Sequence, residues 1–196
     1  MTYVGIDVSK ATFIVAYSSA KSSKTKTFKN TTKGVHEFIQ TLSANEHHCV
    51  LEATGNYSSL LVYLLSRANI TVSLENPLKI KNFARVMLSV TKTDETDARL
   101  IALYGQRMQP APYKLRSDAI LTLKQKRTVI RQLKKQLIAT QNLKGSMEAL
   151  PFFDPKCKKA IEKTIVFLEK QTKGLEEELA ALAQSCLLYT SDAADE

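Results

Sequence analysis

The sequence predicts an α/β fold, with a mixed five-stranded sheet flanked by helices and followed by an antiparallel helical, coiled-coil arm. Two observations support this prediction. Segments rich in β-branched and aromatic residues alternate with amphipathic segments up to about residue 109, and long helical segments with few strand formers follow. The length of 196 residues and the apolar content of 44% allow one sizeable core with a smaller unit beside it.

Three strands are expected first, at residues 3–8, 11–18 and 24–29. Each is rich in Val, Ile, Thr, Tyr or Phe, and polar turn residues separate them, so they should form an antiparallel meander. Residues 32–42 then carry apolar side chains at the spacing of a helix with one buried face, with Thr32 available as its cap.

Two crossover units should follow the meander. Their elements are a strand at residues 48–52, a helix at 57–67, a strand at 71–74, a helix at 77–87 and a helix from Thr93 or Asp94 through Tyr104. Pro77 suits a first helical turn, where its missing N–H would have no partner. Because a helix between two strands of one sheet makes them parallel, the complete sheet is expected to be mixed.

The segment after residues 109–112, which contain two prolines, is expected to form two packed helices. Residues 150–155 (LPFFDP) should form the turn between them. We therefore predict a first domain at 1–110, a basic helical hairpin at 111–185 and a tail at 186–196. The tail, CLLYTSDAADE, matches the peptide encoded by a common transposon-based sequencing adapter, so we treat it as non-native.

The positive charge is concentrated in the predicted hairpin. The net charge is +9, and nine basic residues against two acidic ones lie between Tyr113 and Leu150. A stretch of this kind favours a polyanionic partner, because Lys and Arg neutralise phosphates and release counterions. The residues expected to contact nucleic acid are Lys124, Lys126, Arg127, Arg131, Lys134 and Lys135.

The cysteines and the hydropathy pattern indicate a reduced, intracellular protein. Cys49, Cys157 and Cys186 show neither an even count nor metal-ligand spacing, and the N-terminus has no charged-then-apolar leader. No apolar run approaches the roughly 20 residues that a membrane span requires, so no membrane contact is expected.

Four carboxylates are candidates for one metal site. Asp7 lies in an apolar strand, Glu52 ends another strand, and Asp94 and Asp97 are spaced to share one helix face. Each has an ordinary structural explanation: an ion pair with Lys10 or a turn-capping role for Asp7, sheet-edge exposure for Glu52, and helix capping for the other two. Taken together, they suit Mg²⁺ or Mn²⁺, which prefer oxygen ligands and act in phosphodiester cleavage.

Four motifs, three of which carry these acids, resemble the DEDD transposases of the IS110 insertion-sequence family, to which the Piv DNA invertases are also similar. The motifs are GIDVSK at 5–10, LEATG at 51–55, NPLKIKNFAR at 76–85 and KTDETDAR at 92–99. The resemblance implies an RNase H-like, RuvC-like first domain, a coiled-coil arm, and a later domain with a nucleophilic serine that lies beyond the present chain.

The resemblance also implies a function and partners. The protein would be a DNA transposase or site-specific recombinase in which Asp7, Glu52, Asp94 and Asp97 bind divalent metal for strand cleavage and exchange. Lys92 and Arg99 would orient phosphate or support the acids. The partners would be DNA, a guide (bridge) RNA and further copies of the chain joined through the arm, in the cytoplasm of a prokaryote and associated with its nucleoid. The fragment by itself is expected to be incomplete and inactive.

Two other functions remain open at this stage. The chain could be a non-catalytic module that binds nucleic acid and dimerises through its arm. It could also bind ATP, since Gly5–Val8 resembles the first phosphate motif of the actin and sugar-kinase fold. That fold needs a second Gly-rich phosphate loop, and the chain has only six glycines and no such loop.

Overall fold

A computed structural model describes residues 1–18, 25–53, 55–87 and 93–192, with side chains described as far as residue 184. Its elements are, in order, β1 (Thr2–Val8), β2 (Thr12–Tyr17), β3 (Lys26–Lys29), α1 (Thr32–Ile39), β4 (His47–Glu52), η1 (Gly55–Ser58), α2 (Ser59–Arg67), β5 (Thr71–Glu75), α3 (Pro77–Val86), α4 (Asp94–Met108), α5 (Asp118–Glu148) and α6 (Pro155–Asp192). The chain separates into two compact units, Met1–Leu115 and Arg116–Glu196.

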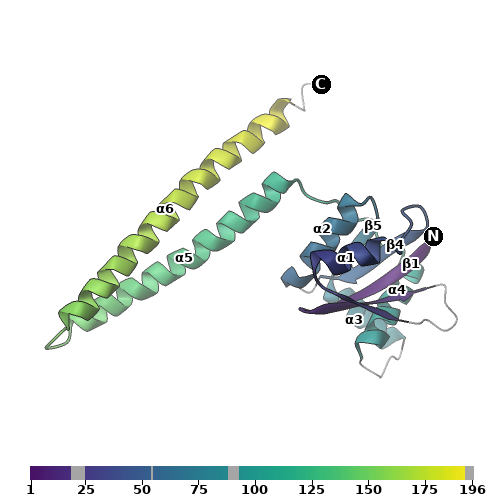
Figure 1. The fold of residues 1–196 in the computed structure, drawn as a ribbon, viewed down its shortest axis with the longest axis horizontal. Coiled ribbons are helices and arrows are strands. Elements are labelled where there is room, and N and C mark those ends of the chain that lie inside the picture. The colour runs from purple at the N-terminus through teal and green to yellow at the C-terminus, as the bar shows by residue number, and fades with distance from the viewer. Residues whose placement is uncertain (19–24, 54, 88–92, 193–196) are drawn as a thin grey trace. The chain divides into compact units, whose positions relative to one another are not determined.

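The first unit contains a five-stranded sheet in the order β3-β2-β1-β4-β5 (Figure 1). β1 pairs antiparallel with β2, and β2 pairs antiparallel with β3, as a meander requires. β1 pairs parallel with β4, and β4 pairs parallel with β5. β2, β3 and α1 lie between β1 and β4 in the chain, and η1 and α2 connect β4 to β5, so each parallel pair has the long crossover connection that it needs. The predicted mixed five-stranded sheet flanked by helices is therefore confirmed.

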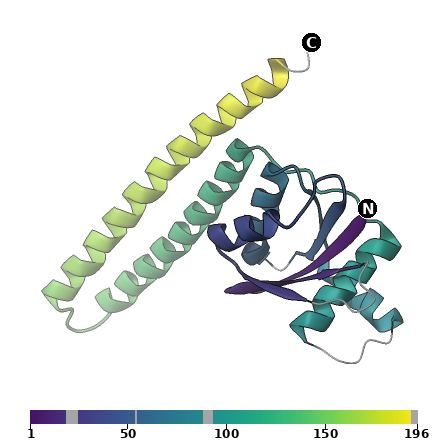
Figure 2. The same ribbon diagram turned by 45° about the vertical axis from the view of Figure 1, so that its right-hand side comes forward.

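Helices cover both faces of this sheet. Figures 1 and 2 show α1 and α2 on one face and α3 and α4 on the other. Alternate residues of β1 follow this division, since Val4, Ile6 and Val8 pack in the core under α1 and α2. Gly5 and Asp7 consequently belong to the face that α3 and α4 cover.

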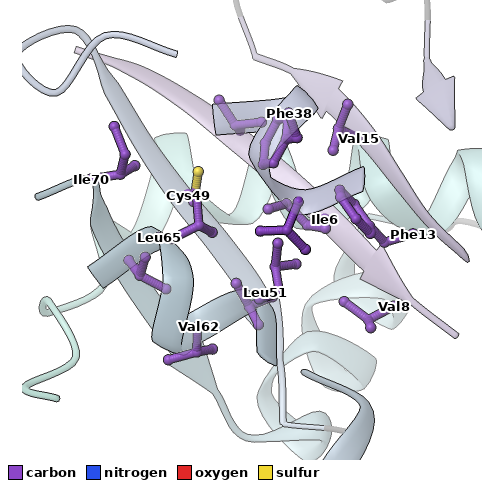
Figure 3. Packing of buried hydrophobic residues seen from close by; sticks show 14 of the residues in the cluster. Ile6, Val8, Phe13, Val15, Phe38, Cys49, Leu51, Val62, Leu65 and Ile70 are labelled. Atoms are coloured by element: carbon purple, nitrogen blue, oxygen red, sulfur yellow. The ribbon is translucent and has the colours of Figure 1, made fainter. Parts of the chain in front are cut away.

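The larger core lies beneath α1 and α2 (Figure 3). Phe13, Phe28 and Phe38 form an aromatic cluster there, with ring centroids 5.2–5.5 Å apart. Leu51 from β4 and Leu65 from α2 complete the layer and are fully buried. This core holds the sheet on which the candidate site is built.

The predicted element boundaries differ in places from the structure. The cap of α1 is Thr31 rather than Thr32, because Thr31 Oγ1 accepts a hydrogen bond from Gly34 N at 3.2 Å. The helix expected at 57–67 divides into η1 and α2. β5 extends to Glu75, one residue beyond the predicted strand end.

The second unit is a hairpin of two long helices, α5 and α6, that lie side by side (Figure 1). Ile130, Leu168 and Thr172 are the residues of this hairpin that are buried within the part the structure describes. Ion pairs link the two helices, including Lys126 with Glu178 and Lys134 with Glu176 at 2.6 Å. The predicted helical arm after the sheet is confirmed.

The segment that leaves the first unit stays attached to it as far as Tyr113. Tyr113 N donates a hydrogen bond to Val72 O at 2.7 Å, and its ring packs against the larger core. The structural boundary accordingly falls after Leu115 rather than after residue 110. Within the described residues, no helix is both long and apolar enough to cross a membrane.

Candidate metal and nucleic-acid site

A close contact between α4 and β1 positions the candidate site. A Cβ atom placed on Gly5 would lie 2.1 Å from Ala102 N and 2.2 Å from Ala98 O. Only glycine lets the helix backbone approach the strand this closely. Asp97 lies immediately before Ala98, and Asp94 lies about one helical turn before it. The contact therefore brings the first turn of α4 to the end of β1 that carries Asp7.

The strand register brings two more carboxylates to the same end of the sheet. Ile6 pairs with Leu51, so Asp7 and Glu52 are the next residues along their two strands. Glu52 pairs in turn with Glu75 of β5. Register neighbours in adjacent strands point to the same face, so the three side chains share the face that α4 covers.

A reciprocal cap starts α4 at the predicted place. Thr93 Oγ1 accepts from Thr96 N at 3.2 Å, and Thr96 Oγ1 accepts from Thr93 N at 2.9 Å. Asp94 and Asp97 therefore both fall in the first helical turn, where the helix dipole favours negative charge. The helix itself thus reduces the cost of placing these acids together.

The electrostatics of Asp7 reflect the other three acids. Its pKa is raised from 3.8 to about 6, first by burial and then by the charges of Asp94, Asp97 and Glu52. Asp7 is half-buried rather than buried, as are Glu52 and Asp97, while Asp94 is exposed. The other three predicted residues therefore lie within electrostatic reach of Asp7.

The same acids are not grouped at ligand distances. Within the described ranges, no three His, Cys, Asp or Glu side chains are close enough together to hold a metal ion as they stand. Coulomb interactions reach farther than coordination bonds, so this finding and the raised pKa of Asp7 are compatible. The donor chemistry fits a hard divalent cation, because four carboxylates repel one another until a positive charge neutralises them.

Glu75 is a carboxylate near the site that the sequence analysis did not select. It is buried, and its Oε2 accepts from Lys79 Nζ at 2.9 Å and from the Tyr104 hydroxyl at 3.3 Å. These contacts connect β5 to α3 and α4. The i,i+4 spacing of Glu75 and Lys79 was the available signal, but the predicted strand ended before Glu75.

The predicted nucleic-acid contacts divide into several groups. Lys92 lies outside the described residues, and Arg99 is exposed on α4. Lys126 and Lys134 are ion-paired with glutamates of α6, so part of their charge is already balanced. The basic residues of α5 that are exposed and have no carboxylate within 4.0 Å in the described part of the chain are Lys124, Arg127, Arg131 and Lys135.

A buried Ser–His pair lies on the same sheet face, nearer the other end of the parallel strands. Ser73 Oγ lies 2.7 Å from His48 Nε2 and donates to Pro110 O at 3.0 Å and Ala111 O at 2.8 Å. Because the single serine proton goes to a carbonyl, His48 Nε2 must be the donor in its own bond. Burial lowers the pKa of His48, which favours this neutral form. The pair fastens the outgoing linker to the sheet.

Comparison with known proteins identifies the family. The model of the DEDD transposases of IS110 type, described as Transposase, matches residues 4–147. The chain belongs to this transposase family. The predicted family membership is therefore confirmed, and the match runs from the first strand into α5.

Two curated relatives support the assignment of this chain to the transposase family. They are the pilin gene-inverting proteins of Moraxella bovis and Moraxella lacunata, each 33% identical over 144 residues. Each match covers 69% of this chain and 45% of the relative. The chain thus spans less than half the length of the curated relatives that it matches.

Solved structures of RuvC from Thermus thermophilus also match. One is 12% identical with a TM-score of 0.41 and covers 58% of this chain and 100% of that chain. Another, RuvC in complex with a Holliday junction substrate, is 13% identical with a TM-score of 0.40 and covers 58% of this chain and 99% of that chain.

Proposed function

We propose that this transposase chain carries a divalent-metal site, formed by Asp7, Glu52, Asp94 and Asp97, for DNA strand cleavage and exchange. The observation that carries the proposal is the raised pKa of Asp7, which burial raises first and the charges of Asp94, Asp97 and Glu52, on two further elements of the fold, raise further. Acids with shifted pKa values that lie together at the ends of neighbouring strands are typical of functional sites. An ordinary cap or surface ion pair would not gather four acids in this way.

The roles of the residues follow from the elements that hold them. Asp7 and Glu52 lie on adjacent strands of a rigid sheet, so their positions are set by backbone pairing. Asp94 and Asp97 approach from the first turn of α4, whose distance from β1 is set by Gly5. Bound Mg²⁺ or Mn²⁺ would activate the attacking oxygen and stabilise the leaving oxygen of a phosphodiester.

The proposed substrate is double-stranded DNA. The two relatives are named as proteins that invert a pilin gene, which is a rearrangement of DNA. The exposed basic residues of α5 would add contacts to a phosphate backbone, whether of DNA or of a guide RNA. Association of chains through the hairpin is part of the same proposal, because apolar side chains such as Ile138, Val166 and Phe167 are exposed on it.

Calorimetric titration of the purified chain with Mg²⁺ and with Mn²⁺ tests the metal site. Asp7→Asn and Asp94→Asn keep the side-chain shape and remove one charge each, so each should weaken binding on the order of tenfold or more. Glu95→Gln is the matched control: it removes one charge from the same helical turn, and Glu95 is not among the acids that raise the pKa of Asp7.

The comparison between the variants decides the outcome. Weaker binding in both aspartate variants, with nearly unchanged binding in Glu95→Gln, supports the proposed site. If all three variants bind Mg²⁺ and Mn²⁺ with the affinity of the unmodified chain, any bound metal lies elsewhere on the chain.

A further inference from the structure

A groove lies at the free edge of the sheet, along β3 and the start of α1. Its volume is about 590 Å³, and its lining includes Lys26, Lys29, Lys33, Thr31, Phe28 and Glu37. Among the residues that the structure describes, β3 is the outermost strand on this side and pairs with β2. The groove is therefore open along an edge of the first unit.

Gly34 explains why the lysines of this groove lie together. A Cβ on Gly34 would lie 2.2 Å from Lys29 O, so the first turn of α1 packs directly on the end of β3. Lys33 precedes this glycine, and the same contact consequently brings it beside Lys29. The Thr31 cap, which accepts from Gly34 N, holds the turn in this position.

The charge of the groove is positive and largely unbalanced. Lys26, Lys29 and Lys33 are exposed, and Glu37 is the acidic residue in the lining. In the described part of the chain, no carboxylate lies within 4.0 Å of any of the three lysine amines. Lys26 Nζ instead lies over the Phe28 ring, 4.8 Å from its centroid. Three such cations fit an anionic ligand.

The groove is tied to the end of the sheet that carries the acids. Asn30, directly after β3, donates from Nδ2 to Ser9 O at 2.9 Å and to Tyr57 O at 3.0 Å. Ser9 follows β1 two residues after Asp7, and Tyr57 lies in η1, shortly after Glu52. One side chain thus connects the loops at the ends of β1, β3 and β4.

The distance to the acids suits a nucleic-acid backbone. Val8, Phe13 and Phe28 pair across β1, β2 and β3, so β3 lies two strand spacings, roughly 10 Å, from β1 at the level of the acids. One strand of duplex DNA carries a charge about every 3.4 Å along the helix axis. The acids belong to the face that α4 covers, and α1, which lines the groove, covers the opposite face. A bound strand with one phosphate at the acids would therefore pass over the ends of β1 and β3, beside Asn30, to place another phosphate near the groove.

We propose that the groove lined by Lys26, Lys29 and Lys33 binds the phosphodiester backbone of the DNA whose strand lies at the four acids. This inference rests on the proposed DNA-cleaving function and adds a second contact to it. In this proposal the lysines hold the DNA strand in position relative to the carboxylates and take no part in breaking the phosphodiester bond. The basic hairpin would then contribute separately to binding.

Fluorescence anisotropy with a labelled 30-bp DNA duplex tests the groove in the full chain. The double variant Lys29→Gln/Lys33→Gln should bind roughly tenfold more weakly near 100 mM salt and lower the slope of log K against log [salt] by about 0.9 per lost contact. Arg67→Gln is the control for the loss of one positive charge away from the groove, because this exposed basic residue ends α2, which leads to the start of β5 at the opposite end of the sheet.

A second measurement reads the groove directly. Amine-reactive labelling followed by mass spectrometry should show Lys29 and Lys33 protected several-fold when the duplex is added. Unchanged affinity and salt slope relative to Arg67→Gln, with no protection, overturn the proposal. Weakened binding of a duplex RNA with unaltered DNA binding also overturns it.

The metal experiment separates this proposal from the proposed function. The lysine variants should retain the Mg²⁺ affinity of the unmodified chain, because the acids are untouched. Loss of DNA binding with normal metal binding supports the groove, whereas failure of the Asp7 and Asp94 variants to change metal affinity contradicts the metal site alone.

Discussion

Asp7 shows how a single residue acquires its properties from distant parts of the chain. Its pKa of about 6 is caused by burial in the sheet and by carboxylates that follow it in the sequence by 45 to 90 residues. The folded protein therefore holds a proton on Asp7 at a pH where the unfolded chain has released it. This difference links stability to pH.

Asp7→Asn is predicted to stabilise the metal-free chain at pH 7.5. Since the folded pKa lies above the unfolded value of 3.8, the unmodified protein loses stability as the pH rises from about 4 to about 6. We expect a gain of roughly 1–2 kcal/mol, reduced from the full shift because the carboxyl is partly exposed. Thermal unfolding in EDTA at pH 4.5 and 7.5 measures it, and a gain equal at both pH values would contradict the assigned cause.

Ser73→Ala is predicted to destabilise the chain by roughly 1–3 kcal/mol, because it leaves buried polar groups of His48 and the linker without their partner. A double-mutant cycle with His48→Phe, which keeps a ring against Tyr3, isolates the pair. Denaturant unfolding of the four proteins gives the coupling. If the loss of unfolding free energy in the double variant equals the sum of the losses in the two single variants, the hydrogen bond between Ser73 and His48 contributes nothing to stability.

Among the elements, α4 does the most to form the site. Its first turn carries two acids, and Tyr104, two turns after Asp97, bonds to buried Glu75. Gly105 continues the close approach of the helix, since a Cβ there would lie 2.8 Å from the Tyr3 ring. The small residues along this face let the helix lie directly on the sheet and hold its acids within electrostatic reach of Asp7.

Gly5→Ala is predicted to disturb both stability and metal binding. The added methyl group meets backbone atoms of Ala98 and Ala102, which cannot rotate away, so α4 must shift at a cost of about 1–3 kcal/mol or more. The Mg²⁺ affinity should fall as the first turn moves. Calorimetry and thermal unfolding check both effects.

Gly145→Ala is the control for this substitution. Gly145 lies within α5, and outside its own helix backbone no atom of the described residues lies within 4 Å of an added Cβ, so alanine should stabilise that helix by roughly 0.5–1 kcal/mol. A similar response of the two glycines would contradict the role assigned to the contact at Gly5.

At the scale of the whole molecule, the two units differ in what stabilises them. The first unit has a layer of fully buried apolar residues on one face of the sheet and smaller clusters on the other. In the described part of the hairpin, Ile130, Leu168 and Thr172 alone are buried, and exposed ion pairs contribute little. The hairpin should therefore depend more on association with a partner.

A fragment of residues 1–115 is predicted to fold by itself. Because the described core clusters and the Tyr113–Val72 hydrogen bond lie within these residues, the midpoint of its thermal unfolding should lie within about 5 °C of the first unfolding transition of the full chain. A fragment of residues 116–184 should instead gain helicity as its concentration rises. Circular dichroism at several concentrations tests both, and a disordered 1–115 fragment would contradict the division into units.

The sequence by itself determined the order of the elements, the mixed sheet and the family. Local patterns suffice for these. Thr93 and Thr96, three residues apart, form the cap that begins α4, and the alternation of side chains along β1 places Asp7 on the face away from the larger core. It also singled out four acids as candidates. Whether they bind metal together remains a proposal.

Only the tertiary structure decided which side chains lie near one another. The proximity of Asp7 to Asp94 depends on the contact of Gly5 with Ala98, and the groove depends on the contact of Gly34 with Lys29. The hydrogen bond from the Tyr104 hydroxyl to Glu75, which connects α4 to β5, is likewise a contact between distant residues that the sequence did not predict. Such contacts join residues far apart in the chain, or on different elements, so their geometry follows from helix and sheet packing and cannot be read from local spacing.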